Sequence, residues 1–390
     1  MEKLKYKQFE EEIRMIYRAF QDLKLSALGM GCLRLPVNKG QGDIDVEATK
    51  KMVAYAFEKG INYYDTAWGY HDGKSETVLG EILKEYPRNS FYLATKFPGY
   101  DAANMNKIEE IFEEQLKKCQ VEYFDFYLFH NVCESNIDGY LNPEFGILQY
   151  LLEQKKNGRI RHLGFSTHGT LDTVKRFLDA YGKYMEFCQI QLNWMDWKLQ
   201  NAKEKVDLLE KYHLPIWVME PVRGGKLANI GAEYEAQLKE IRPNATVVEW
   251  AFRFLQSIPS VTMTLSGMSN LEQLKENVAT YETEAPLNDH EIKKLFEVGE
   301  AMTAKITLPC TSCCYCISHC PMELGIPDLI ELYNEHVYTG DGYIAPVVIG
   351  ALPEEKKPSA CLGCRACEAV CPQNIKISEM MRDFVEKLKE

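Results

Sequence analysis

Two cysteine runs of identical spacing constrain this chain more than any other feature. They are Cys310, Cys313, Cys316 and Cys320 before Pro321, and Cys361, Cys364, Cys367 and Cys371 before Pro372. This C-x2-C-x2-C-x3-C-P spacing is typical of bacterial [4Fe–4S] cluster modules, in which the fourth cysteine of a run binds the other cluster. We therefore expect two [4Fe–4S] clusters, with the ligand sets Cys310, Cys313, Cys316, Cys371 and Cys361, Cys364, Cys367, Cys320.

Structural zinc is the alternative, because paired CxxC elements also form tetrahedral zinc sites. The third CxxC step and the Cys-Pro end, both repeated, are not needed for zinc. Disulfides are disfavoured, because the chain has 13 cysteines and its charged beginning has no signal-peptide pattern. The segment of about residues 305–378 resembles a ferredoxin-type dicluster domain.

Before the cysteines, strand and helix patterns alternate. Apolar runs predict strands at 23–35, 62–65, 91–96, 124–130, 162–166, 187–193, 216–220 and 261–265. Helical spacing lies between them, for example at 46–59, 108–119, 145–157, 171–181, 201–212, 243–256 and 271–281. Repeated strand–helix units imply a parallel sheet, and eight of them predict an α/β fold closed into a (β/α)8 TIM barrel.

The length indicates more than one domain, because 390 residues exceed the roughly 250 of one barrel. We predict an N-terminal helical extension at 1–20, a barrel at 21–304 and a small C-terminal cluster domain at 305–390. Residues 340–353 are expected to form a loop in the last domain.

Charge and hydropathy exclude several classes of function. The net charge of −12 disfavours binding to nucleic acid or to an anionic membrane surface. No uncharged apolar stretch is long enough to cross a bilayer. We expect a cytoplasmic protein with metal or redox chemistry.

Polar residues end three of the predicted strands. Asp65, Lys96 and His130 each follow an apolar run, and Tyr70 lies in the loop after the first of them. In a parallel barrel these ends collect catalytic groups. Lys96, held by Asp65, is expected to lower the phenol pKa of Tyr70, so that Tyr70 acts as general acid while His130 orients a substrate oxygen.

These motifs resemble the aldo-keto reductase family. The matching stretches are Asp65-Thr-Ala-x-x-Tyr70, Ala94-Thr-Lys96, Leu128-Phe-His130, Gly29-x-Gly31, Gly164-Phe-Ser166, Gln189-Ile-Gln191-Leu-Asn193 and Ser269-x-x-x-Gln273-x-x-x-Asn277. The likeness covers about residues 14–300. It implies a barrel with Asp65, Tyr70, Lys96 and His130 as catalytic residues and Tyr70 as proton donor.

The same resemblance implies a nicotinamide cofactor. Its expected contacts are Gly31, Ser166, Gln191, Gly224, Gly267, Ser269, Gln273 and Asn277. Three features depart from the family pattern: Thr167 replaces an Asn, Met219 replaces a stacking aromatic residue, and no Lys or Arg lies at 267–273. A 2′-phosphate would need a cation there, so NADH is slightly favoured over NADPH. Arg223 and Lys226 are alternative sources of positive charge.

The resulting hypothesis is an oxidoreductase that interconverts a carbonyl and an alcohol, with clusters that exchange single electrons with ferredoxin or another electron-transfer protein. Two alternatives stay open. One is a cluster-fed reductase without nicotinamide, and the other is a non-catalytic barrel that serves as an electron-transfer scaffold.

Overall fold

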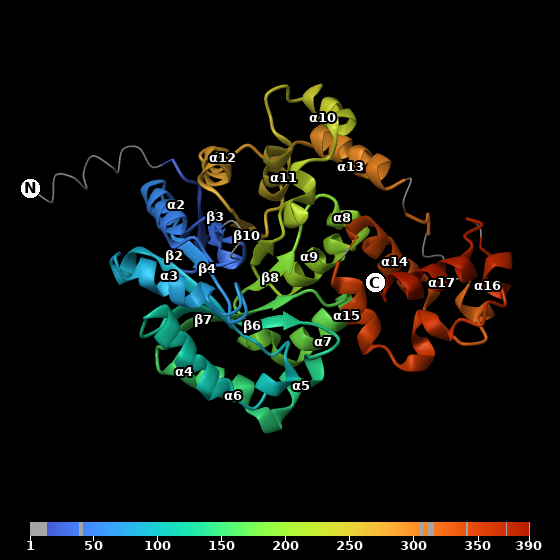
Figure 1. Cartoon of the computed structure of the whole chain (residues 1–390), viewed down its shortest axis with the longest axis horizontal. Coiled ribbons are helices and arrows are strands. Elements are labelled where there is room, and N and C mark those ends of the chain that lie inside the picture. The colour runs from blue at the N-terminus through green and yellow to red at the C-terminus, as the bar shows by residue number, and fades with distance from the viewer. Residues whose placement is uncertain are drawn as a thin grey trace, which may run out of the picture. The chain divides into compact units, whose positions relative to one another are not determined.

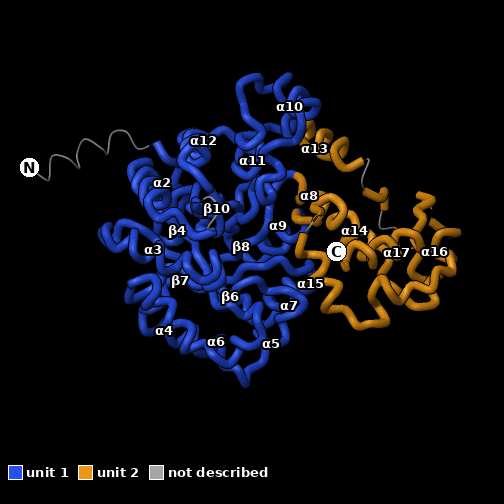
Figure 2. The backbone as a smooth tube through the Cα atoms, viewed as in Figure 1, with its two compact units in different colours: residues 1–194, 203–292 blue, residues 195–202, 293–390 orange. Residues whose placement is uncertain are grey.

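The computed structural model describes residues 14–38, 42–304, 307–310, 316–340, 342–371 and 373–389. The chain divides into two compact units, one of residues 1–194 and 203–292 and the other of residues 195–202 and 293–390 (Figure 2). In this division most of helix α13 (Asp289–Thr303) belongs to the second unit. The sequence-based boundary after residue 304 stays a prediction.

The first unit is built around a closed barrel of parallel strands, as the strand–helix alternation predicts (Figure 1). The order around the barrel is β10-β3-β4-β5-β6-β7-β8-β9. The strands are β3 (Leu28–Gly31), β4 (Tyr63–Asp65), β5 (Tyr92–Phe97), β6 (Phe124–Val132), β7 (Ile160–Thr167), β8 (Cys188–Gln191), β9 (Ile216–Met219) and β10 (Val261–Gly267).

Helices lie between successive strands, and one follows the last strand. They are α2 (Val46–Glu58), α3 (Ser75–Leu83), α4 (Ile108–Cys119), α5 (Ile137–Leu141), α6 (Ile147–Lys156), α7 (Leu171–Tyr181), α9 (Ala202–Lys211), α10 (Ala232–Lys239), α11 (Val247–Gln256) and α12 (Leu271–Tyr281). Local chemistry sets their ends. The Asp45 side chain caps α2 by accepting from Ala48 N, and Gly60 follows this helix at φ 85°, a conformation that favours glycine.

The N-terminal segment corrects two expectations. Residues 17–20 are not helical but form β1 (Tyr17–Phe20), which pairs antiparallel with β2 (Leu23–Ser26). The predicted first strand at 23–35 is consequently split between β2 and the barrel strand β3, followed by a short turn at Cys32–Arg34. Residues 1–13, which the helical prediction also included, lie outside the described residues.

Tertiary packing explains the hairpin. The Phe20 ring lies 5.1 Å from Trp217 and 5.6 Å from Phe126, near the starts of β9 and β6. Phe20 and Leu25 belong to the aromatic core cluster inside the barrel. The hairpin therefore closes the end of the barrel where the strands begin.

The second unit is helical and has its own core. Its helices are α8 (Asp196–Leu199), α13 from Lys293 onward, α14 (Ile326–Thr339), α15 (Ile344–Ala351), α16 (Ala366–Ala369) and α17 (Ile377–Lys387). The loop expected at 340–353 is wrong, because α15 buries Ala345, Val348 and Ile349 on one face. Four cysteines of the two runs pack against this core while partly buried: Cys310, Cys320, Cys361 and Cys371.

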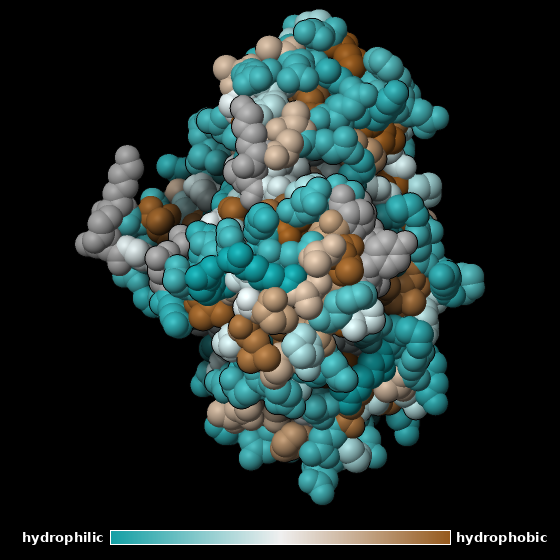
Figure 3. Space-filling model, turned by 90° about the vertical axis from the view of Figure 1, so that its right-hand side faces the viewer, coloured by the Kyte–Doolittle hydropathy of each residue, from teal (hydrophilic) through white to brown (hydrophobic). Residues whose placement is uncertain are grey.

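Two surface observations complete the fold. The face shown in Figure 3 is mostly hydrophilic, with small apolar patches scattered over it. Across the described ranges, no helix combines the length and the apolar character needed to cross a membrane.

Candidate active site and cysteine pocket

Neighbouring strands bring the expected catalytic residues together at one end of the barrel. Asp65 is the last residue of β4, and it pairs in register with Ala94 of β5. Lys96 of β5 pairs with Leu128 of β6, two residues before His130. Because parallel strands end on the same side, the three side chains lie close together. Tyr70 reaches them from the loop between β4 and α3.

Lys96 is the centre of this cluster. Its Nζ donates to Asp65 Oδ1 at 2.6 Å, to the carbonyl oxygen of Thr66 at 2.7 Å and to Tyr70 Oη at 3.3 Å. The Lys96 side chain is fully buried and that of Asp65 is 4% exposed. Three acceptors satisfy the three protons of the ammonium, so a buried cation is held without a missing partner.

Tyr70 and His130 face each other across the site. Their ring centroids are 6.0 Å apart at 78°, and the Tyr100 ring packs edge-on to His130 at 5.2 Å. The His130 Nδ1 has no hydrogen-bond partner among the described residues. Burial, followed by the nearby Lys96, holds the pKa of His130 well below its usual range. His130 is therefore a neutral imidazole that can exchange a hydrogen bond with a substrate oxygen.

The pKa of Tyr70 corrects one expectation. Burial raises this pKa, and Lys96 lowers it as expected but does not outweigh the burial, so the net shift is upward. The pKa of Lys96 is also raised, because Asp65 and then Tyr70 outweigh the lowering by burial. Tyr70 thus keeps its proton and Lys96 its charge, which suits a phenol that donates a proton rather than one that starts ionised.

A buried polar network behind Lys96 was missed by the sequence analysis. Gln115 Nε2 of α4 donates to the Lys96 carbonyl oxygen at 3.0 Å and to Glu76 Oε1 at 2.7 Å. Thr95 Oγ1 donates to the same Glu76 oxygen at 2.7 Å, and Tyr127 Oη donates to Gln115 Oε1 at 2.6 Å. The only signal in the sequence was one polar residue on the apolar face of each of two helices, Glu76 in α3 and Gln115 in α4. The network fixes the backbone of the strand that carries Lys96.

Two expected cofactor residues lie at the ends of the next strands. Ser166 of β7 accepts a hydrogen bond from Asn131 N at 2.8 Å, which leaves its hydroxyl proton free to donate. Gln191 ends β8 and hydrogen bonds His168, whose pKa burial lowers to about 3. Asn131 Oδ1 is buried without a partner among the described residues. This side of the opening therefore offers unused polar capacity to a ligand.

The other expected positions gather at β3, β9 and β10. Gly31 and Gly267 are paired in register. The other three side chains form local hydrogen bonds. Ser269 Oγ donates to Arg34 O, Gln273 Oε1 accepts from Ser269 N, and Asn277 Nδ2 donates to Ser266 Oγ. Gly224 follows β9 at φ 63°. A Cβ on Gly31 would lie 3.2 Å from Ser266 O, and one on Gly224 would lie 3.1 Å from Arg34 Nη2. The glycines thus form a narrow cradle that side chains would fill.

The departures from the family pattern have local explanations. Thr167 Oγ1 donates to Val132 O at 2.7 Å and accepts from Gly169 N, so it is used within its own loop. Met219 Sδ accepts from Gln189 Nε2 at 3.7 Å. Of the two cations expected to supply charge, Arg223 is 4% exposed and Lys226 is exposed.

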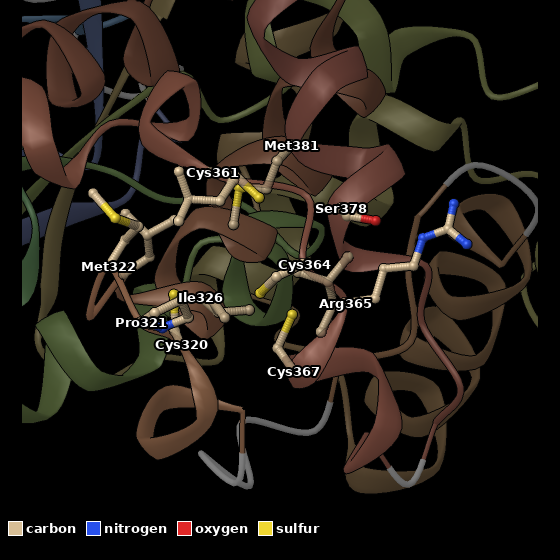
Figure 4. Close-up of a pocket in the computed structure, with 13 residues that line it drawn as sticks. Cys320, Pro321, Met322, Ile326, Cys361, Cys364, Arg365, Cys367, Ser378 and Met381 are labelled. Atoms are coloured by element: carbon tan, nitrogen blue, oxygen red, sulfur yellow. The ribbon is translucent and has the colours of Figure 1, made fainter.

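A pocket in the second unit is bordered by cysteines from both runs. Cys320, Cys361, Cys364 and Cys367 line it together with apolar residues that include Ile326 (Figure 4). Burial and then Cys361, with a smaller effect from Cys320, raise the pKa of the Cys367 thiol to about 11. One cysteine of the first run and three of the second therefore line the same pocket. Of the other expected set, Cys310, Cys316 and Cys371 are described, whereas Cys313 lies outside the described residues.

Comparison with known proteins identifies the class. Residues 27–300 match the model of the aldo/keto reductase family, and residues 309–375 match that of a 4Fe-4S dicluster domain. A closed barrel with this polar end is the fold of that first family. The chain belongs to the aldo/keto reductase family and carries a C-terminal 4Fe-4S dicluster domain, which favours clusters over the zinc alternative.

Relatives and solved structures agree with this assignment over the barrel. The chain is 24% identical to "Uncharacterized oxidoreductase YqkF" of Bacillus subtilis, over 70% of this chain and 92% of the relative. It is 25% identical to the NADH-specific methylglyoxal reductase of Escherichia coli, over 72% and 97%. The holo form of aldo-keto reductase AKR11C1 from Bacillus halodurans matches 73% of this chain and 96% of its own, with 24% identity and a TM-score of 0.61.

Proposed function

We propose that this protein interconverts a carbonyl and an alcohol by hydride transfer from NAD(P)H, with Tyr70 as the general acid. The observation that carries the proposal is the bond of Lys96 Nζ to both Asp65 Oδ1 and Tyr70 Oη, at 2.6 and 3.3 Å. This bond holds the protonated Tyr70 phenol beside the buried Lys96 ammonium, at the end of the barrel where catalytic groups collect. Family membership supports an oxidoreductase, and the nucleotide and the proton donor are part of the proposal.

Each residue has a separate task in this mechanism. A bound nicotinamide supplies or accepts the hydride. His130, neutral because of its lowered pKa, donates a hydrogen bond to the substrate oxygen. Tyr70 passes its proton to that oxygen as negative charge develops on it, and Lys96 stabilises the phenolate that remains. Asp65 keeps Lys96 charged.

The expected cofactor positions fit a dinucleotide. Ser166 and Gln191 carry polar groups at the ends of β7 and β8, and Gly31, Gly224 and Gly267 have no side chain at points where neighbouring segments come close. The cysteine pocket fits a cluster as well, because four thiols border one largely apolar space. Clusters held there carry one electron each, which would connect the barrel to a one-electron partner such as ferredoxin.

An anaerobic titration of the cluster-loaded protein with NADH and NADPH, followed by tryptophan fluorescence, tests the cofactor. Binding of either nucleotide is expected. The absence of binding at millimolar concentration would overturn the nicotinamide part of the proposal. Four of the five tryptophans, Trp68, Trp194, Trp217 and Trp250, belong to the first unit, so the signal reports mainly on the barrel.

Replacement of Tyr70 by Phe tests the acid. We expect kcat to fall about 10²–10⁴-fold, the usual contribution of a general acid, with little change in nucleotide binding. Methylglyoxal, named in one relative, is a suitable first substrate. Because His130 is neutral, the pH profile should show no ionisation near its ordinary pKa of about 6.5. If Tyr70→Phe left every detectable redox activity of the protein unchanged, the scaffold alternative would gain support.

The cluster-fed alternative has one specific support, since Thr167 and Met219 replace family contacts to the nicotinamide ring. It predicts reduction of the substrate by chemically reduced clusters with no nucleotide present. Turnover with NAD(P)H after removal of both clusters would exclude it.

A further inference from the structure

We propose that Arg34 binds the pyrophosphate of the nicotinamide dinucleotide. The inference rests on the proposed function and adds a binding residue to it. Arg34 lies far in sequence from the expected phosphate contacts, in the turn Cys32–Arg34 after β3.

The Arg34 side chain runs along the cradle of glycines. Ser269 Oγ donates to the Arg34 carbonyl oxygen at 3.0 Å, which fixes the turn against the loop after β10. A Cβ on Gly267 would lie 3.2–3.3 Å from three side-chain carbons of Arg34, so the aliphatic stem covers this glycine. The stem therefore passes over the end of β10.

The guanidinium ends beside the loop after β9. A Cβ on Gly224 would lie 3.1 Å from Arg34 Nη2 and 3.4 Å from Glu220 Oε2. Gly224 has φ 63°, so a side chain there would be strained as well as crowded. The lack of a side chain at Gly224 and Gly267 gives the guanidinium its place between the two loops.

The charge of Arg34 is available to a ligand. Arg34 is exposed, and its guanidinium makes no hydrogen bond or ion pair within the ranges that the structure describes. A guanidinium binds phosphate oxygens in a bidentate manner that a lysine does not match.

Position favours the pyrophosphate over a 2′-phosphate. The guanidinium lies between Gly224 and Gly267, two of the positions that the family resemblance assigns to pyrophosphate and adenosine contacts, whereas the side chains of Ser269 and Gln273 are used in local hydrogen bonds. NADH and NADPH share the pyrophosphate and differ only at the 2′ position. Arg34 should therefore strengthen the binding of both nucleotides by the same factor.

The test is an anaerobic fluorescence titration of the whole cluster-loaded protein and its Arg34→Ala and Arg34→Lys variants with NADH and NADPH. We expect Arg34→Ala to raise both dissociation constants about tenfold or more, in equal proportion, because charge-assisted hydrogen bonds are lost. Arg34→Lys should fall between. Arg176→Ala, which removes an exposed arginine paired with Asp138, is the matched control and should bind as the wild type does.

The other outcomes overturn the inference in distinguishable ways. Equal binding by wild type and Arg34→Ala would leave the nicotinamide function standing and remove Arg34 from it. A loss confined to NADPH would assign Arg34 to the 2′-phosphate and contradict the pyrophosphate assignment. Binding of neither nucleotide by the wild type would overturn the proposed function and the role of Arg34 together.

Discussion

Two carboxylates at opposite ends of the barrel, Asp65 and Glu186, are treated differently by the fold. Glu186 accepts from four donors: Gln21 Nε2, Lys155 Nζ, His162 Nδ1 and Leu163 N, at 2.7–2.9 Å. Asp65 Oδ1 accepts from Lys96, and its Oδ2 has no partner among the described residues. Burial raises the pKa of both groups, but the four donors reverse this for Glu186 and lower its pKa to about 2, whereas Lys96 does not reverse it for Asp65.

This difference indicates that the two ends of the barrel have different roles: the end with Glu186 stabilises the fold, and the end with Asp65 carries the candidate catalytic groups. Glu186 links the N-terminal hairpin, through Gln21, to β7 and α6 at the end where the strands begin. Among the described residues, the Asp65 carboxylate bonds only to Lys96 through Oδ1, and its Oδ2 and the Nδ1 of neighbouring His130 have no partner. Unsatisfied buried groups reduce stability, and they persist where a ligand completes them. Under the proposed function, the buried charges at the catalytic end serve the reaction, whereas the hairpin end stabilises the barrel.

The largest expected effect comes from breaking the pair at the mouth. Lys96→Met leaves the Asp65 carboxylate buried without its cation and should lower the free energy of unfolding of the barrel by about 3–5 kcal/mol. Denaturant unfolding followed by tryptophan fluorescence measures this. The double variant Asp65→Asn/Lys96→Met should recover part of the loss. A single variant as stable as the wild type would mean that Asp65 is protonated in the folded protein.

The next largest effect should arise at the opposite end. Phe20→Ala removes a 3% exposed ring that packs on Phe126 and Trp217, and we expect a loss of about 3–4 kcal/mol in the same unfolding measurement. Nucleotide affinity should not change, because the ring is at the far end from the catalytic residues. A loss of affinity without a loss of stability would contradict the division of roles.

Acid should weaken the hairpin end through Glu186. Its folded pKa of about 2 is below the ordinary value of about 4.3, so its stabilisation is complete above pH 4.3 and is lost as the pH falls towards 2. The shift of about two units corresponds to about 3 kcal/mol at most. Unfolding of wild type and Glu186→Gln at pH 5 and pH 3 measures it: the wild type should lose more stability between the two, and equal losses would exclude Glu186 as the cause.

The smallest effect provides the baseline. Lys175 and Asp179 form an exposed i,i+4 pair on α7 at 2.7 Å. Lys175→Ala should leave the free energy of unfolding almost unchanged, because solvent screens such pairs. A loss comparable to that of Lys96→Met would show that charge removal at any site destabilises this protein.

Much of the candidate site was predictable because its signals are local. The position of Asp65, Lys96 and His130 at strand ends follows from apolar runs that stop, and strand direction alone then places them together. The barrel and the dicluster domain were predicted correctly for the same reason. The ligand sets and the catalytic roles remain predictions, although the pocket bordered by Cys320, Cys361, Cys364 and Cys367 agrees with one set.

Other features depended on contacts between distant segments. The spacing of Ile13, Ile16, Tyr17 and Phe20 suited a helix, yet residues 17–20 form a strand because Phe20 is buried against Trp217. Likewise the apolar stretch at 344–351 contains Gly350 and Pro346, which suggest a loop, but burial of one face makes it helical.

The sequence by itself determined which groups this protein carries and in what order: a phenol, an ammonium, a carboxylate and an imidazole at one end of a barrel, and eight cysteines spaced for clusters. Tertiary structure alone decided how those groups titrate and which others join them. Burial raised the pKa of Tyr70 by more than Lys96 lowered it. Folding also placed Arg34 beside Gly224 and Gly267. The reason is physical, since desolvation and through-space contacts depend on all surrounding atoms, whereas spacing depends on the chain alone.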